Sequence, residues 1–165
     1  MKREAKIPII IKALCEAKWE WQPAYCKHLA LKLKPEDTDE VPFRWTYEFA
    51  DDVDLTVYFD DEDDNKVDWI ELTTKVHFDP ENLSAKKYEQ LIKNFTSEFE
   101  ATANLIEGNL GKPVFRGGFK DSGRRKDHEG VVQAYWKIKN AVLIAVLKHE
   151  DREVPIRNVV VVAPK

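Results

Sequence analysis

Few cysteines occur in this sequence, and their scarcity excludes two classes of small protein. Cys15 and Cys26 are the only two, and ten residues separate them. One isolated pair supports neither a disulfide framework nor a cysteine-rich zinc cluster. We therefore expect two buried free thiols, because free cysteine is among the most buried residue types. A reducing compartment fits best, and we expect the protein to be cytoplasmic.

Serine and glycine are also scarce, which removes two common catalytic motifs. The three serines stand outside any G-x-S-x-G elbow of a serine hydrolase. Of the six glycines, the pair Gly117-Gly118 lacks the lysine and helix of a P-loop and the third glycine of a dinucleotide fingerprint. The sequence therefore predicts no cofactor.

Long apolar runs are missing as well. The longest, residues 141–147, is far shorter than the roughly 18 residues that span a bilayer, and we interpret it as a buried strand. Residues 1–11 start basic and turn apolar, like a secretion signal. Lys12, Glu16 and Lys18 interrupt that stretch, and no small-residue cleavage site follows. We expect neither a membrane span nor a membrane partner.

Metal-binding motifs fail when their spacing is tested. The four histidines, His28, His77, His128 and His149, form no H-E-x-x-H pair. The acidic stretch after residue 59 does not fit an EF-hand loop, because lysine or asparagine falls where glycine is required. We predict no metal site. A small hydrolase or metal-dependent enzyme built from dispersed histidines and carboxylates remains the alternative to a binding protein.

Hydrophobic periodicity predicts a mixed α+β chain. Residues 8–21 show helical spacing, and residues 25–33 alternate like a half-buried strand. A polar stretch follows at residues 35–42. Further strands are predicted at residues 44–50, 54–59, 67–78, 114–119, 131–138, 141–148 and 154–162. On the strand 67–78, Ile70, Leu72, Val76 and Phe78 are expected to share the apolar face.

The clearest element is a long amphipathic helix over residues 84–107. Its apolar face is spaced at three and four residues and comprises Tyr88, Leu91, Ile92, Phe95, Phe99, Ala103 and Ile106. Ser84 is a suitable N-cap, and Gly108 fits the position after the last turn. We predict a single α+β domain over residues 1–165, with mostly antiparallel sheet packed on one long central helix and a short N-terminal helix. We expect sheet on both sides of that helix.

Charge is distributed unevenly along the chain. Residues 36–81 carry 17 acidic and 3 basic side chains, whereas the remainder carries 13 acidic and 23 basic ones. The densest acidic clusters fall in or beside predicted turns, where the side chains reach water. One interpretation is a solvated hairpin tip that resists aggregation. The other is a docking surface for a basic protein partner, since a focused negative field accelerates encounter.

The docking interpretation defines a set of candidate partner-binding residues. Trp69 belongs to it because an exposed tryptophan beside an acidic hairpin is a typical interface anchor. The full set is Asp51, Asp52, Asp54, Asp60, Asp61, Glu62, Asp63, Asp64 and Trp69. The basic run Arg124-Arg125-Lys126 is diluted by Asp121, Asp127 and Glu129, so we do not expect nucleic acid as a partner.

The layout of the second half resembles small acidic bacterial immunity proteins. Residues 104–113 end the long helix, a strand with Tyr135-Trp136 follows, and two strands close the chain. The resemblance implies a compact cytoplasmic inhibitor that docks electrostatically onto a basic toxin, commonly a nuclease. Acidic type III secretion chaperones are similar in size and charge, and would imply a groove that holds an extended effector segment. Neither resemblance assigns a role to a residue.

Overall fold

The computed structural model describes residues 3–63 and 65–165 as three α-helices, a short 3₁₀ turn and one eight-stranded antiparallel sheet. The predicted α+β class, with its long helix and its short N-terminal helix, is confirmed. The helices are α1 (Arg3–Glu16), α2 (Pro23–Lys32) and α3 (Ala85–Leu110), with η1 at Pro80–Asn82. The strands are β1 (Asp37–Val41), β2 (Arg44–Ala50), β3 (Val53–Phe59), β4 (Val67–His77), β5 (Phe115–Gly118), β6 (Val132–Ile138), β7 (Ala141–Lys148) and β8 (Ile156–Pro164).

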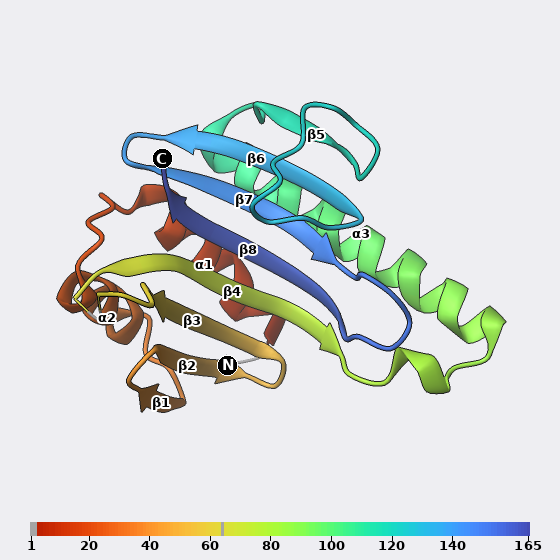
Figure 1. Ribbon diagram of the computed structural model, residues 1–165, viewed down its shortest axis with the longest axis horizontal. Helices are drawn as coiled ribbons and strands as arrows, with labels where there is room; N and C mark the ends of the chain where they lie inside the picture. The colour runs from red at the N-terminus through yellow and green to blue at the C-terminus, as the bar shows by residue number, and fades with distance from the viewer. Residues whose placement is uncertain (1–2, 64) are drawn as a thin grey trace.

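Two four-stranded meanders form the sheet. β1 to β4 are neighbours in chain order, β5 to β8 are neighbours in chain order, and β4 pairs with β8 to join the two halves. The expectation of sheet on both sides of the long helix is therefore wrong. α3 links β4 to β5, and α1 and α3 lie together on one face of a continuous sheet (Figure 1). We call this the inner face, and the opposite one the outer face.

The main core lies between the inner face and the two helices. Phe95, Phe99, Ala103 and Ile106 of α3 are buried there, as predicted from their spacing. The inward side chains of alternate strand positions meet them, because successive residues of a strand point to opposite faces. A second, smaller cluster of buried apolar side chains lies on the outer face, over β7 and β8.

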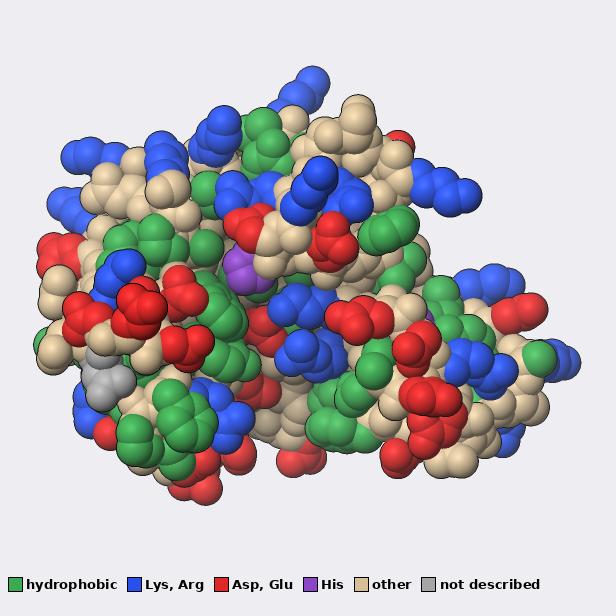
Figure 2. All heavy atoms as spheres, viewed as in Figure 1, with side chains coloured by type: hydrophobic (Ala, Val, Ile, Leu, Met, Phe, Trp, Pro, Cys, Tyr) green, Lys and Arg blue, Asp and Glu red, His purple; other side chains and the backbone are tan. Residues whose placement is uncertain are grey.

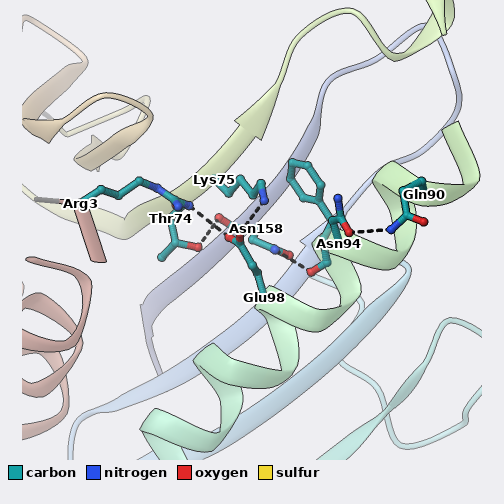
Figure 3. Close-up of polar contacts among 8 residues, drawn as sticks. Arg3, Thr74, Lys75, Gln90, Asn94, Glu98 and Asn158 are labelled. Atoms are coloured by element: carbon teal, nitrogen blue, oxygen red, sulfur yellow. Dashed lines mark hydrogen bonds and ion pairs between the residues drawn. The ribbon is translucent and has the colours of Figure 1, made fainter. Parts of the chain in front are cut away.

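Polar contacts fasten the helices to the sheet at one point. Glu98 of α3 accepts hydrogen bonds from Arg3 at the start of α1 (3.1 Å) and from Lys75 of β4. The side chain of Asn158, on β8, donates to the carbonyl oxygen of Phe95 at 2.8 Å. Figure 3 shows these side chains converging from α1, β4, β8 and α3. The N-terminal helix is thereby held to both the sheet and the long helix.

Two segments near the N-terminus differ from the prediction. Residues 25–33 were expected to form a strand, but α2 occupies Pro23–Lys32. Cys26 and Ala30 are buried four residues apart, so the apolar positions fit a helical face as well as an alternating one. The polar stretch 35–42 contains β1, a strand whose residues are mostly exposed. An exposed edge strand has no apolar alternation, so the pattern could not reveal it.

The N-terminal helix also lies earlier than predicted. It covers Arg3–Glu16, not residues 8–21, and residues 17–22 leave the helix. Trp19 donates its indole N–H to the Leu14 carbonyl oxygen at 3.2 Å and stacks on Trp21 with ring centroids 5.5 Å apart. This contact satisfies a carbonyl near the helix end and turns the chain toward α2.

The long helix has the predicted start and a later end. Ser84 accepts a hydrogen bond from the Lys87 amide and is the N-cap. The helix passes Gly108 and continues to Leu110, and the cap is Gly111 with φ of +80°. Positive φ at the helix end favours glycine, which explains why the helix ends there.

A β-bulge in β4 changes which face its last residues occupy. The pairing of β4 with β8 shifts between Thr73 and Lys75. Ile70 and Leu72 are buried as predicted, but Val76 and Phe78 cross to the outer face, and Phe78 is 64% exposed. The prediction that all four share one apolar face is therefore wrong beyond the bulge.

Across the described residues, we find no helix with the length and apolar character needed to cross a membrane.

Candidate functional site

The outer face of the sheet is divided into a covered half and an uncovered half. Over β7 and β8 it is apolar, and the connection between β5 and β6, residues 119–131, crosses this half (Figure 1). The buried side chains in this half are Val142, Ile144, Val146, Val159, Val161 and Ala163. Gln133 fastens the connection, because its side chain bonds the His128 carbonyl oxygen (2.7 Å) and the Arg125 amide (2.8 Å).

The uncovered half forms a groove of about 740 Å³ over β1 to β4. Seven carboxylates line it against two guanidinium groups, so we call it the acidic groove. The charged lining residues are Glu36, Asp39, Glu48, Asp51, Asp52, Asp54, Glu71, Arg44 and Arg157. In Figure 2, which views the outer face, acidic side chains lie at the left end, along the lower edge and at the right end, whereas basic ones lie along the top, near β5 and β6, and in the centre.

Carboxylates from three neighbouring strands stand in register on the outer face. Asp37 of β1 is opposite Glu48 of β2, and Glu48 is opposite Asp54 of β3. Within the described part of the chain, none of the three has a cation within ion-pair distance. Like charges directly opposite each other destabilise a sheet. This row is therefore a cost to folding that a cationic ligand would relieve.

Asp54 lines the groove, and the pKa of its carboxyl is raised. Burial is the main cause that raises its pKa above the ordinary value, and the hydroxyl of Thr56, donating at 3.0 Å, partly offsets that rise. Neighbouring Glu71 raises the pKa further, whereas Arg157 lowers it. A desolvated carboxylate without an ion-pair partner binds an incoming cation more strongly than a fully hydrated one.

Glu71 lies deeper, and the fold already neutralises it. Its side chain is 4% exposed and accepts from Lys148 at 2.6 Å and from Arg157 at 2.8 Å. These three residues come from β4, β7 and β8, which are adjacent or nearly adjacent strands. Arg157 also lines a second hollow of the outer face. It therefore lies at the boundary between this hollow and the acidic groove.

The second hollow has a volume of about 820 Å³ and brings two histidines together. His128 and His149 both line it, whereas His28 lies on α2 and His77 ends β4. Burial lowers the pKa of both lining histidines, and nearby Lys148 lowers that of His128 further. His149 is tied to the Tyr88 hydroxyl at 2.5 Å. The described residues contain no group of three or more His, Cys, Asp or Glu side chains that could hold a metal ion.

The candidate residues from the sequence fall at two ends of one strand. Asp51, Asp52 and Asp54 line the acidic groove at the β2–β3 turn. Asp60, Asp61, Glu62 and Asp63 lie at the β3–β4 hairpin tip, beyond the other end of the seven-residue strand β3. At about 3.3 Å per residue, the two groups are roughly 20 Å apart. Asp64 lies outside the described residues.

Trp69 is half-buried in the outer face, close to the border between its two halves. Its ring stacks on Tyr58 with centroids 4.6 Å apart, and the His128 ring meets it edge-on at 5.8 Å. The indole N–H is buried and has no hydrogen-bond partner among the described residues. Trp69 therefore links the covering connection to β3 and β4.

Sequence reasoning missed six of the nine charged groove residues, namely Glu36, Asp39, Arg44, Glu48, Glu71 and Arg157. The sequence predicted strands at residues 44–50 and 54–59, which correspond closely to β2 and β3. It did not show which residues of neighbouring strands lie opposite each other, because that depends on the register of β1 and β4.

Comparisons with family models, with curated proteins and with solved structures found no match to this chain.

Proposed function

We propose that this protein binds a basic protein partner through the acidic groove on the outer face. The observation that carries this proposal is the excess of carboxylates over cations in the groove, together with the row Asp37, Glu48 and Asp54 that has no ion pair within the described chain. Lysine or arginine side chains of a partner would reduce the repulsion between these carboxylates, and this reduction would favour binding.

The hairpin tip extends the negative field beyond the groove. Asp61, Glu62 and Asp63 are exposed there, whereas Asp60 is paired with Lys66 at 3.2 Å. Exposed charges of one sign accelerate the approach of an oppositely charged protein, even where they make no contact in the complex. We propose that the hairpin tip attracts the approaching partner, and that the acidic groove makes the direct contacts in the complex.

Inhibition of a basic toxin, as in the immunity proteins that the sequence resembles, is one form of this binding. In that case the acidic surface would cover a cationic active site. Cys15 and Cys26 are both buried free thiols, which suits a reducing compartment, and we place the interaction in the cytoplasm.

A peptide titration tests the proposal without a known partner. The probe is a fluorescent peptide of alternating arginine and serine, and the control probe has glutamate in place of arginine. We expect the basic peptide to bind at low salt and to dissociate as salt is added, because screening weakens exposed charge pairs. Fluorescence anisotropy measures both. Equal binding of the two peptides, or no binding of the basic one at low salt, would contradict the proposal.

A further inference from the structure

The two halves of the sheet have the same strand order but different covers. Each half is a four-stranded meander, with β1 to β4 corresponding to β5 to β8. The connection between β5 and β6 spans residues 119–131 and lies over the outer face of its own half. The corresponding turn between β1 and β2 is only Pro42-Phe43, because Val41 pairs with Arg44. Among its described residues, the first half therefore has no segment of its own that reaches across β2 to β4.

The side chains beneath the two positions differ in kind. The covered half presents valine, isoleucine and alanine to the 119–131 connection. The uncovered half presents Glu48, Asp54 and the buried ion pair of Glu71, with Val76 and Phe78 at one end of the groove. The bulge in β4 brings these last two to the outer face, where the Phe78 ring stays 64% exposed.

We propose that an extended basic segment of the partner protein lies across this uncovered half, in the place that the 119–131 connection takes on the other half. This inference rests on the proposed function and specifies the occupant of the groove. A segment that runs along β3, which has seven residues, has room for roughly seven residues of extended chain in the groove. One arginine of that segment bridges Glu48 and Asp54, and an apolar side chain contacts Phe78.

Arginine suits the central position better than lysine. Glu48 and Asp54 lie directly opposite each other on adjacent strands, so their carboxylates are close enough for one planar guanidinium to bond both. A lysine ammonium is a point charge and loses part of this geometry. A second copy of this chain is a poor occupant, because the two arginines of its basic 119–131 connection are already paired with Glu129 and Asp127.

The test maps where a defined peptide binds. The probe is the heptapeptide Arg-Ser-Arg-Ser-Arg-Ser-Leu, whose arginines and leucine share one face of an extended chain. It is titrated into isotopically labelled protein and followed by backbone amide shifts. We expect the shifts to concentrate on β2, β3 and β4 around Glu48, Asp54 and Thr73. Shifts confined to residues 60–66 would overturn the docking of a segment in the groove but leave binding of a basic partner intact. No shifts and no anisotropy change at low salt would overturn both.

Two charge-matched variants sharpen the result. Glu48→Gln with Asp54→Asn removes two charges from the groove, and Asp61→Asn with Asp63→Asn removes two from the tip. We expect the groove variant to lose roughly tenfold or more in affinity, as for loss of a charge-assisted hydrogen bond, and the tip variant less than about threefold. Equal losses would show a diffuse field and overturn the inference. Urea unfolding of both variants confirms that each remains folded.

Two further substitutions test the two side chains assigned to the segment. Replacing the three arginines of the probe by lysine should weaken binding several-fold, because bidentate contact is lost. Removing the terminal leucine should weaken peptide binding to the unaltered protein. It should leave the affinity for the Phe78→Ser variant unchanged. An identical effect of leucine removal in both proteins would overturn the assigned contact with Phe78.

Discussion

Arg157 reaches from β8 to the buried carboxylate of Glu71 on β4 and donates to it at 2.8 Å. Lys148 of β7 donates to the other oxygen of the same carboxylate at 2.6 Å. One buried anion thus holds two cations on the outer face, at the boundary between the acidic groove and the second hollow.

Removing that anion should destabilise the fold. In Glu71→Gln the side chain keeps its size, but Lys148 and Arg157 face each other without a counter-charge. Because both cations are partly exposed, we expect a loss of roughly 1–3 kcal/mol in the free energy of unfolding, measured by urea denaturation. The control is Glu129→Gln, which breaks the more exposed pair with Arg124 and should cost less than about 1 kcal/mol. Equal costs for the two variants would show that burial of Glu71 contributes nothing.

Neutralising Asp54 should have the opposite effect at neutral pH. Burial raises the pKa of Asp54 in the folded protein above its unfolded value of about 3.9. As the pH rises through this interval, the unfolded chain releases the proton first, so the folded protein loses stability. Asp54→Asn removes that loss and also the repulsion with Glu48. We expect the variant to be more stable than the original by roughly 0.2–1 kcal/mol at pH 7.

The same comparison at acid pH gives the control. Below the unfolded pKa the Asp54 carboxyl is protonated in both states, so the advantage of Asp54→Asn should disappear. Urea denaturation at several pH values measures the difference between the two proteins. An advantage that persists unchanged to low pH would arise from packing and would contradict the electrostatic account.

Local patterns were sufficient for elements whose packing is set by nearby residues. The helix α3 was predicted within a few residues, because its buried face repeats every three to four positions and Ser84 caps it. The strand Ala141–Lys148 was predicted at the same bounds, since its run of buried apolar residues is flanked by polar turns. Both elements could be predicted from sequence because the same residues determine the local conformation and the burial.

The acidic groove was only partly predictable, because it depends on pairing between strands. The sequence identified Asp51, Asp52 and Asp54 from their charge. It did not predict β1, whose exposed Asp37–Val41 shows no apolar alternation, and so it could not place Asp37 opposite Glu48. The bulge after Thr73 is likewise set by pairing with β8, which lies more than eighty residues away. Register and bulges are tertiary properties, and single-strand patterns do not contain them.

The two thiols should be inert in the folded protein. Burial raises the pKa of Cys26 to about 12, and burial together with Glu16 raises that of Cys15 to about 11. Since the thiolate is the reactive form, we expect neither thiol to be alkylated by iodoacetamide at pH 8 until the chain unfolds. Mass spectrometry of native and urea-unfolded samples counts the added groups. Rapid alkylation of either thiol in the native sample would contradict its burial.

Two glycines offer a matched test of how closely the covering connection approaches the sheet. A Cβ added at Gly130 would overlap the Val146 side chain and lie 2.5 Å from the Leu147 carbonyl oxygen, whereas one at Gly108 would meet nothing within 4 Å.

Gly130→Ala should therefore force the connection away from β7 and cost roughly 1–3 kcal/mol in the free energy of unfolding. Gly108→Ala lies in an exposed turn of α3 and should stabilise by roughly 0.5–1 kcal/mol, because alanine loses less backbone entropy in a helix. Urea denaturation measures both. If Gly130→Ala proved as neutral as a surface change, the 119–131 connection would not pack against the outer face, and the contrast between a covered and an uncovered half would fail.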